Sequence, residues 1–191
     1  MLPIELIAIG TSLGGMRALS VVLGALPEDF GPAIVVVQHR HKMSNEGLPS
    51  YLRTQTSLPV VDVDDKLFIR PGRVYLAPAD YHLLVEKGAF DLSVDAAVSY
   101  SRPSIDVLFE SAADAYRAGL VGVILTGSNA DGARGAVRIK QQGGFVIAQD
   151  PKSAEAPEMP QAAIDAVRVD RILPLERIGP FLAELCRPNR T

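Results

Sequence analysis

Short, uninterrupted runs of apolar residues recur along the chain, and each ends at a glycine or a polar residue. Four of them cover residues 6–9, 33–37, 120–125 and 145–148. Continuous rather than alternating hydrophobicity is typical of strands that are buried on both faces, as in a parallel sheet covered by helices. We therefore predict buried parallel strands at these four segments.

The segments between these runs carry apolar residues at helical spacing. They predict helices at 16–26, 104–117, 133–142, 159–166 and 175–186, the first of which ends before Pro27. A strand–helix–strand unit nearly always crosses over in the right-handed sense. The pattern predicts an α/β fold with a doubly wound, mainly parallel sheet and helices on both faces.

The middle of the chain is less regular. Shorter strand patterns occur at 59–63 and 72–78, and the segment 82–86 faces 90–94 across residues 87–89. The last two segments predict a small antiparallel hairpin. Because no linker or repeat interrupts the chain, we expect residues 1–191 to form one domain.

Composition excludes several classes of function. The formal net charge is -3, and the 19 Lys and Arg residues are scattered, so no basic field or aromatic-lined groove indicates nucleic-acid binding. Cys186 is the only cysteine, which excludes an internal disulfide and a cysteine-based zinc site. We expect it to have a packing or surface role. The chain has neither a secretory signal pattern nor a membrane-length apolar segment, so we expect a cytoplasmic protein without membrane insertion.

The first predicted strand leads directly into a glycine-rich turn. Residues 10–15 read Gly-Thr-Ser-Leu-Gly-Gly, which places Ser12 in a G-x-S-x-G pattern between a strand and a helix. Such a turn exposes a serine nucleophile, and the helix N-terminus stabilises an oxyanion. Ser12 as a helix cap and the glycines as a phosphate cradle are alternatives. A dinucleotide fingerprint, however, requires glycine at position 12, and a P-loop requires a lysine that is absent here.

A histidine follows the second strand. His39 comes directly after the run 33–37 and Gln38, at the carboxyl end where active sites of open α/β sheets lie. It is the candidate general base for Ser12. His41 is a weaker competitor because it lies farther into the loop. His82 begins a hairpin strand, and we expect it to be structural.

A carboxylate follows a third buried strand. Asp131 lies in a glycine-rich turn before the helix predicted at 133–142 and is a candidate to orient the histidine. Helix capping is the alternative role, and Asp150 is a rival carboxylate. The chain order Ser–His–Asp differs from the Ser–Asp–His order of α/β-hydrolases, which indicates a different scaffold with the same catalytic geometry.

The chain resembles the catalytic domain of the CheB protein-glutamate methylesterases over nearly its whole length. The matching segments are 9–15, 35–39, 71–78, 102–109, 122–127, 148–150 and 159–164. The resemblance implies Ser12 as nucleophile, His39 as base and Asp131 as orienting acid. It also implies hydrolysis of glutamate γ-methyl esters on the cytoplasmic helices of methyl-accepting chemotaxis receptors, without a metal or organic cofactor. Some members of the family also deamidate receptor glutamines.

Three features depart from the family pattern. Leu13 stands where the family usually has threonine, and Ser128 stands where it has a methionine near the oxyanion. From these matching positions we predict that Leu13 and Ser128 bind the oxyanion or the substrate. Residues 40–42 (Arg-His-Lys) replace the usual Met-Pro-Pro and predict a more basic substrate rim. A member that binds receptors or other signalling partners without turnover is therefore an alternative. The receiver domain common in the family is missing, and the native Met1 favours a stand-alone enzyme over a fragment.

Overall fold

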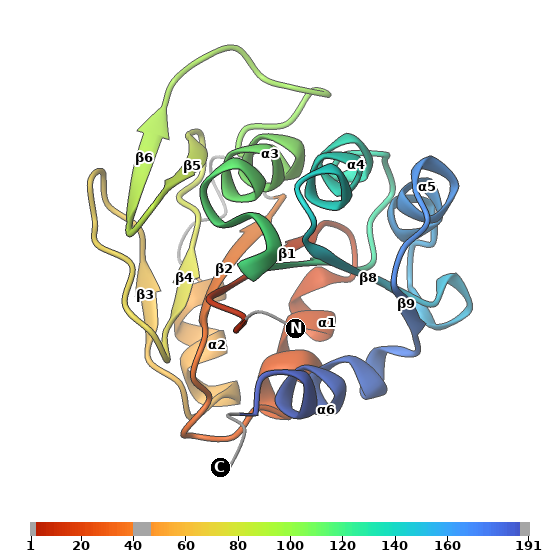
Figure 1. Cartoon of the computed structure of the whole chain (residues 1–191), viewed down its shortest axis with the longest axis horizontal. Helices are drawn as coiled ribbons and strands as arrows, with labels where there is room; N and C mark the ends of the chain where they lie inside the picture. Colours follow the sequence, from red (N-terminus) through yellow and green to blue (C-terminus); the bar gives the residue numbers. More distant parts are fainter. Residues whose placement is uncertain (1–2, 40–46, 188–191) are drawn as a thin grey trace.

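The computed structural model describes residues 3–39 and 47–187, and a seven-stranded parallel sheet runs through its centre (Figure 1). Every neighbouring pair in this sheet is parallel. In spatial order the strands are β3 (Val60–Asp62), β4 (Val74–Leu76), β2 (Ala33–Gln38), β1 (Leu6–Thr11), β7 (Leu120–Ile124), β8 (Phe145–Gln149) and β9 (Arg171–Leu173). The chain turns from β1 to β2 on one side and later to β7 on the other, so β1 is the point where the winding reverses.

Helices cover both faces of the sheet. On one face lie α1 (Gly15–Gly24), α2 (Leu48–Gln55) and α6 (Leu175–Leu185), and on the other α3 (Ile105–Tyr116), α4 (Ala133–Gln141) and α5 (Glu158–Ala166). Side chains that point to opposite faces of β1 enter two separate cores: Ile7 and Ile9 pack toward α1, and Leu6 and Ala8 toward α3. The fold class predicted from the sequence is confirmed.

A two-stranded antiparallel sheet packs against α3. It consists of β5 (His82–Glu86) and β6 (Ala89–Ser93), whose buried Leu83, Val85 and Phe90 join the core on the α3 face. The predicted hairpin is confirmed, with a shorter turn of only Lys87 and Gly88 because β6 begins at Ala89. Single 3-10 turns occupy η1 (Arg117–Gly119) and η2 (Pro151–Ser153).

Helix α2 was missed by the sequence patterns. It has eight residues, carries Pro49 in its first turn and buries few side chains, chiefly Leu48 and Leu52. So short a helix has too few turns to show a periodicity, and it is stabilised by packing on the sheet rather than by its own sequence.

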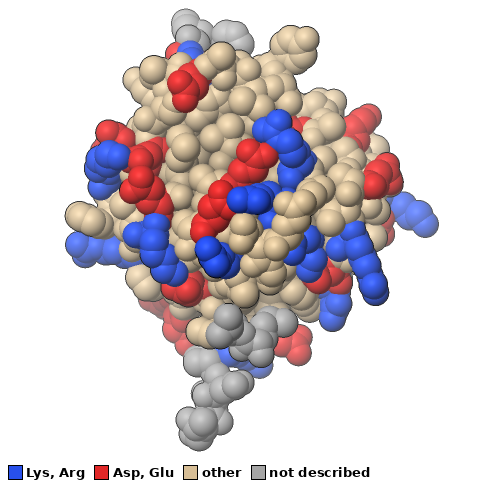
Figure 2. Space-filling view, turned by 45° about the horizontal axis from the view of Figure 1, so that its top comes forward, with Lys and Arg blue, Asp and Glu red and all other residues tan. Residues whose placement is uncertain are grey.

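The surface carries charges of both signs. Acidic and basic side chains are interspersed over the face shown in Figure 2, without a large area of one sign. Two of the ion pairs, Arg134–Glu110 and Arg138–Asp114, join α4 to α3. Within residues 3–39 and 47–187, no helix is long and apolar enough to cross a bilayer.

Candidate active site

Three neighbouring strands bring the predicted residues to one edge of the sheet. Ser12 follows β1, His39 follows β2 and Asp131 lies in the loop after β7, and these strands are adjacent in the order β2-β1-β7. The pairing of Thr11 with Gln38 places Ser12 level with His39. Backbone bonds continue past the strand ends, because His39 N donates to Thr11 O (3.0 Å) and Ser12 N donates to Thr126 O (2.9 Å). The three loops therefore leave the sheet in a fixed register.

The turn after β1 requires its glycines. Gly14 has a φ of 77°, in the left-handed region that favours glycine. A Cβ on Gly15 would lie 2.0 Å from Gln38 Oε1, so no larger residue fits without displacing that side chain. Helix α1 begins at Gly15 with Gly14 as its N-cap and without a side-chain cap. Ser12 is therefore not the helix cap that was one alternative for it.

His39 and Asp131 form a close pair. His39 Nε2 lies 2.7 Å from Asp131 Oδ2, while His39 Nδ1 lies 3.5 Å from both Ser101 Oγ and Asn129 Nδ2. In chymotrypsin-type triads it is Nδ1 that faces the carboxylate. In this protein it is Nε2 that faces the carboxylate. When Nε2 carries the proton and donates it to Asp131, Nδ1 is the ring nitrogen that can accept a hydrogen bond.

Asp131 is buried at the N-terminus of α3. Its carboxylate accepts from Ser104 Oγ (2.8 Å), Ile105 N (2.7 Å) and Asp106 N (3.0 Å) in addition to His39. Burial acts to raise the pKa of Asp131, but the bonds from His39 and from the backbone N–H groups outweigh it, and the net pKa is lowered. Asp131 is thus ionised and caps α3, whereas the N-cap of the following helix α4 is Gly132.

A second buried carboxylate caps the neighbouring helix in return. Asp106, in the first turn of α3, accepts from Gly132 N (3.0 Å) and Gly135 N (2.8 Å) at the start of α4. The pKa of Asp106 is raised, chiefly by burial. The bond from Gly135 N acts to lower this pKa, whereas repulsion by Asp131 raises it further. The two carboxylates lock α3 to α4 directly behind the site.

Asp106→Asn is expected to stabilise the fold at neutral pH. A raised folded-state pKa means that ionisation costs stability once the pH exceeds the carboxyl's ordinary value, so the variant should melt about 2–4 °C higher at pH 7. This advantage should vanish below about pH 4, where the parent is protonated in both states. Thermal unfolding across this pH range measures it, with Asp29→Asn in the exposed turn before β2 as the control; a lower melting temperature for Asp106→Asn at pH 7 would contradict it.

Ser12 and His39 line one open cavity of about 830 Å³. Ser99, Tyr100, Ser101 and Asn129 are among its other lining residues. The structure contains no hydrogen bond between Ser12 and His39 side chains, although both face the same space. Catalytic hydrogen bonds are often long or misaligned without substrate. The arrangement thus brings a hydroxyl and an imidazole that is hydrogen-bonded to a carboxylate to one substrate-sized space.

The two residues predicted at the oxyanion lie in neighbouring loops: Leu13 directly follows Ser12, and Ser128 lies in the loop after β7. Leu13 and Ser128 are both exposed, and within the described residues neither backbone N–H is engaged in a hydrogen bond. Thr126 fixes their loops, because its Oγ1 donates to Leu13 O (2.9 Å) and its backbone O accepts from Thr11 Oγ1 (2.8 Å). Two donors are thus available beside Ser12.

The other candidates lie elsewhere. His82 is buried and structural, as predicted; its Nε2 donates to Ala96 O (3.0 Å) and its Nδ1 accepts from Ser104 N (3.2 Å). Asp150 caps the 3-10 turn η2 through Lys152 N. His41 and the basic segment 40–42 lie outside the described residues.

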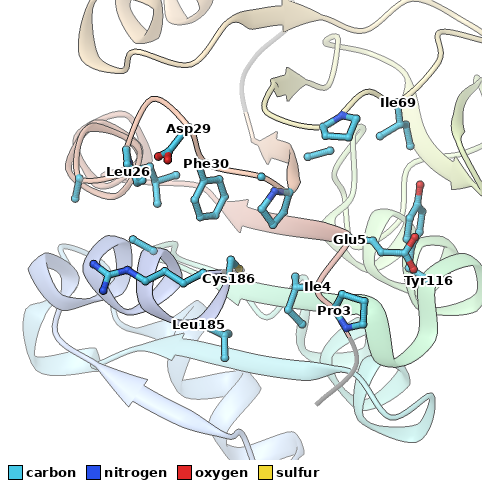
Figure 3. A pocket seen from close by; sticks show the side chains of 18 of the residues that line it. Pro3, Ile4, Glu5, Leu26, Asp29, Phe30, Ile69, Tyr116, Leu185 and Cys186 are labelled. Carbon is cyan, nitrogen blue, oxygen red and sulfur yellow. The ribbon is translucent and has the colours of Figure 1, made fainter. Parts of the chain in front are cut away.

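A larger cavity, of about 1670 Å³, opens at the opposite edge of the sheet (Figure 3). Its lining includes Glu5 before β1, Phe30 before β2, Tyr116 and Cys186. Burial raises the pKa of the Cys186 thiol to about 11, so the thiol is protonated at neutral pH. Among the described residues that line this cavity there is no histidine, and so no counterpart of the imidazole–carboxylate pair.

Several supporting residues were not predicted from the sequence. Gln38 Nε2 donates to the carbonyls of both Ser12 (2.8 Å) and His39 (2.9 Å), and Ser104 joins His82 to Asp131. Asn129 accepts from Asp131 N through its Oδ1 (3.1 Å). Ser104 does precede a helical pattern, which is the signal of an N-cap, and it caps α3. Its second bond, to Asp131, joins residues 27 positions apart and carries no local signal.

Comparison with known proteins agrees with this geometry. Residues 7–182 match the family model described as CheB methylesterase. The chain belongs to the CheB methylesterase family. The crystal structure of the Thermotoga maritima CheB methylesterase catalytic domain superposes with a TM-score of 0.91 at 34% identity, over 96% of this chain and 100% of that one.

Relatives of this CheB-family chain differ in length. A Leptospira interrogans protein named protein-glutamate methylesterase/protein-glutamine glutaminase is 44% identical over 97% of this chain and 96% of its own. The protein-glutamate methylesterase FrzG of Myxococcus xanthus is 39% identical over 95% of this chain, but this covers only 55% of FrzG. The chain thus spans nearly all of one relative and about half of the other.

Proposed function

We propose that this CheB-family chain hydrolyses glutamate γ-methyl esters on the cytoplasmic helices of chemotaxis receptors, with residues 1–191 acting as one catalytic domain. The observation that carries the proposal is the 2.7 Å bond between His39 and Asp131 beside a cavity that Ser12 also lines. The names of the relatives support the choice of ester.

The proposed reaction has two halves. His39 Nδ1 takes the proton of Ser12 Oγ, which attacks the ester carbonyl carbon, and the N–H groups of Leu13 and Ser128 hold the oxyanion. Methanol leaves with the proton from His39 as the acyl-serine forms. A water molecule, deprotonated by His39, then attacks the acyl carbon. The bond between this carbon and Ser12 Oγ breaks, His39 returns the proton to Oγ, and the glutamate is released.

The role proposed for Asp131 is to hold the His39 ring in place and to compensate the positive charge that the ring acquires during the reaction. Its ionised carboxylate keeps the proton on Nε2, so that Nδ1 remains available to Ser12, and it stabilises the imidazolium that forms during both halves. The bonds from Ser104 and from the start of α3 fix the carboxylate itself. Hydrogen bonds that fix a supporting side chain in this way preserve the geometry of the reacting groups.

Methanol release tests the proposal directly. The protein is incubated with a receptor cytoplasmic fragment that carries glutamate methyl esters, and free methanol and the mass of the fragment are followed. We expect catalytic methanol release; none above the rate of the fragment alone would contradict the esterase function. An unmethylated fragment with glutamine at the same positions tests the deamidase activity through ammonia release.

Two positions favour a second candidate, a receptor-binding module with little turnover. Leu13 and Ser128 replace the residues that the family usually has beside the oxyanion, and both are exposed at the site. Saturable binding to the methylated fragment without methanol release would establish this alternative.

A further inference from the structure

A tight turn at the mouth of the Ser12 cavity holds two non-glycine residues in the left-handed region. Val98 and Ser101 exchange two backbone hydrogen bonds of 3.1 and 2.9 Å, which leaves Ser99 (φ 51°) and Tyr100 (φ 63°) at its tip. A turn with positive φ at both central residues strongly prefers Asn-Gly. Tyrosine is an unfavourable residue there, because its Cβ crowds the following carbonyl. The turn therefore retains a residue that its backbone disfavours.

The Tyr100 side chain does not stabilise the described structure. It is fully exposed, at 104% of its reference area, and is the most exposed of the large hydrophobic residues described. An aromatic ring left in water contributes no burial free energy to folding. Backbone strain combined with an unburied ring is a feature of functional rather than structural positions.

The base of the turn is rigidly held. Arg102 donates to Asp80 Oδ1 through Nη2 (2.6 Å) and Nε (3.1 Å), and to the carbonyls of Val94 (2.7 Å) and Asp95 (3.0 Å) through Nη1. Arg102, Asp80 and the turn residues line the same cavity as Ser12 and His39. The backbone that carries the ring is thus held in place at the cavity, so a substrate meets Tyr100 without first ordering a loop.

We propose that Tyr100 is a specificity-determining residue that packs against an apolar side chain of the substrate helix. The inference rests on the proposed function for the identity of the reaction. When a methyl-glutamate side chain enters the cavity, residues three or four positions away on its helix lie on the same face. Leu13 is 56% exposed and directly follows Ser12, so it offers a second apolar side chain next to the nucleophile. Exposed aromatic anchors of this kind dominate the affinity of many interfaces.

A variant that relaxes the turn separates this role from a structural one. Ser99→Asn combined with Tyr100→Gly supplies the preferred turn residues, so its melting temperature should be equal to or higher than that of the parent. We expect kcat/KM for the methylated receptor fragment, divided by kcat/KM for p-nitrophenyl acetate, to fall about tenfold, as for loss of an aromatic anchor. The loss should lie mainly in KM. A structural role for Tyr100 predicts the opposite, a lower melting temperature with an unchanged ratio.

Equilibrium binding tests the same role independently of turnover. In a Ser12→Ala background, adding Tyr100→Ala should weaken binding of the same fragment about tenfold. Phe68→Ala is the matched control, because it removes an aromatic ring that is 72% exposed but does not line this cavity. It should leave the binding affinity and the kcat/KM ratio unchanged. If the parent protein released no methanol, the proposed function would be contradicted, but the binding role of Tyr100 would not. Equal binding with and without the Tyr100 ring, or no saturable binding at all, would overturn the inference.

Discussion

Ser12→Ala is expected to lower the rate of methanol release by several orders of magnitude, on the order of 10⁴–10⁶ as in other serine triads. The variant lacks the oxygen that forms the acyl intermediate, so only slow direct attack by water remains. Ser12 faces an open cavity, and its side chain has no hydrogen-bond partner among the described residues, so the fold should tolerate the change. Steady-state methanol release with the methylated receptor fragment measures the effect.

Two further serines make this result specific. Among the residues that the structure describes, the Ser20 hydroxyl bonds only the Arg17 carbonyl on α1, so Ser20→Ala should keep the parent rate. Ser101 is the rival nucleophile, because its Oγ lies 3.5 Å from His39 Nδ1. We expect Ser101→Ala to cost at most about tenfold, the scale of one lost neutral hydrogen bond. A greater loss for Ser101→Ala than for Ser12→Ala would reassign the nucleophile.

Asp131→Asn is expected to have the second largest effect, on the order of 10⁴ in kcat, as for the corresponding change in a chymotrypsin-type triad. Each carboxylate oxygen accepts from two donors, Oδ2 from His39 and Ile105 and Oδ1 from Ser104 and Asp106. An amide offers one acceptor and places an NH₂ group against two donors. His39 loses its charge partner, and its tautomer is no longer fixed.

The same change should also lower stability, by about 1–3 kcal/mol for buried donors left without acceptors. Because the folded-state pKa of Asp131 is lowered, the carboxylate stabilises the fold above its ordinary pKa of about 4, and this contribution is lost as the pH falls further. The stability gap between parent and variant should therefore shrink below about pH 4. Denaturant unfolding at several pH values measures the gap.

Asp150→Asn provides the matched control. Asp150 also follows a buried strand, but its carboxylate caps the turn η2 rather than facing the imidazole. We expect its kcat to remain within about threefold of the parent, because surface substitutions of this kind have small effects. A large loss for Asp150→Asn together with an active Asp131→Asn would exchange the roles of the two carboxylates.

Much of the fold follows from local hydrophobic patterning. Segments such as 33–37 and 120–125 bury both faces of a strand and so read as continuous apolar runs, and β2 and β7 are found there. The positions of Ser12, His39 and Asp131 after three such strands were sufficient to predict one cluster, since parallel strands share a carboxyl edge. The short helix α2, held by tertiary packing, gave no pattern.

Contacts between distant segments escaped prediction. Asp131 caps α3 while Asp106 caps α4, and each bond joins residues more than 20 positions apart. The choice of Nε2 rather than Nδ1 for the carboxylate depends on the side-chain orientation of His39. The exposed Tyr100 turn conflicts with local turn preferences, and such conflicts between local propensity and structure concentrate at functional sites.

The central claim is that His39, held by Asp131, activates Ser12, and labelling with a fluorophosphonate tests it most directly. These reagents phosphonylate activated serines, and peptide mass spectrometry locates the label without knowledge of the receptor. We expect the parent protein to be labelled on Ser12 and His39→Gln to be labelled far more slowly. Labelling of Ser12 at equal rates in both proteins, or labelling of another serine in the parent, would contradict the claim.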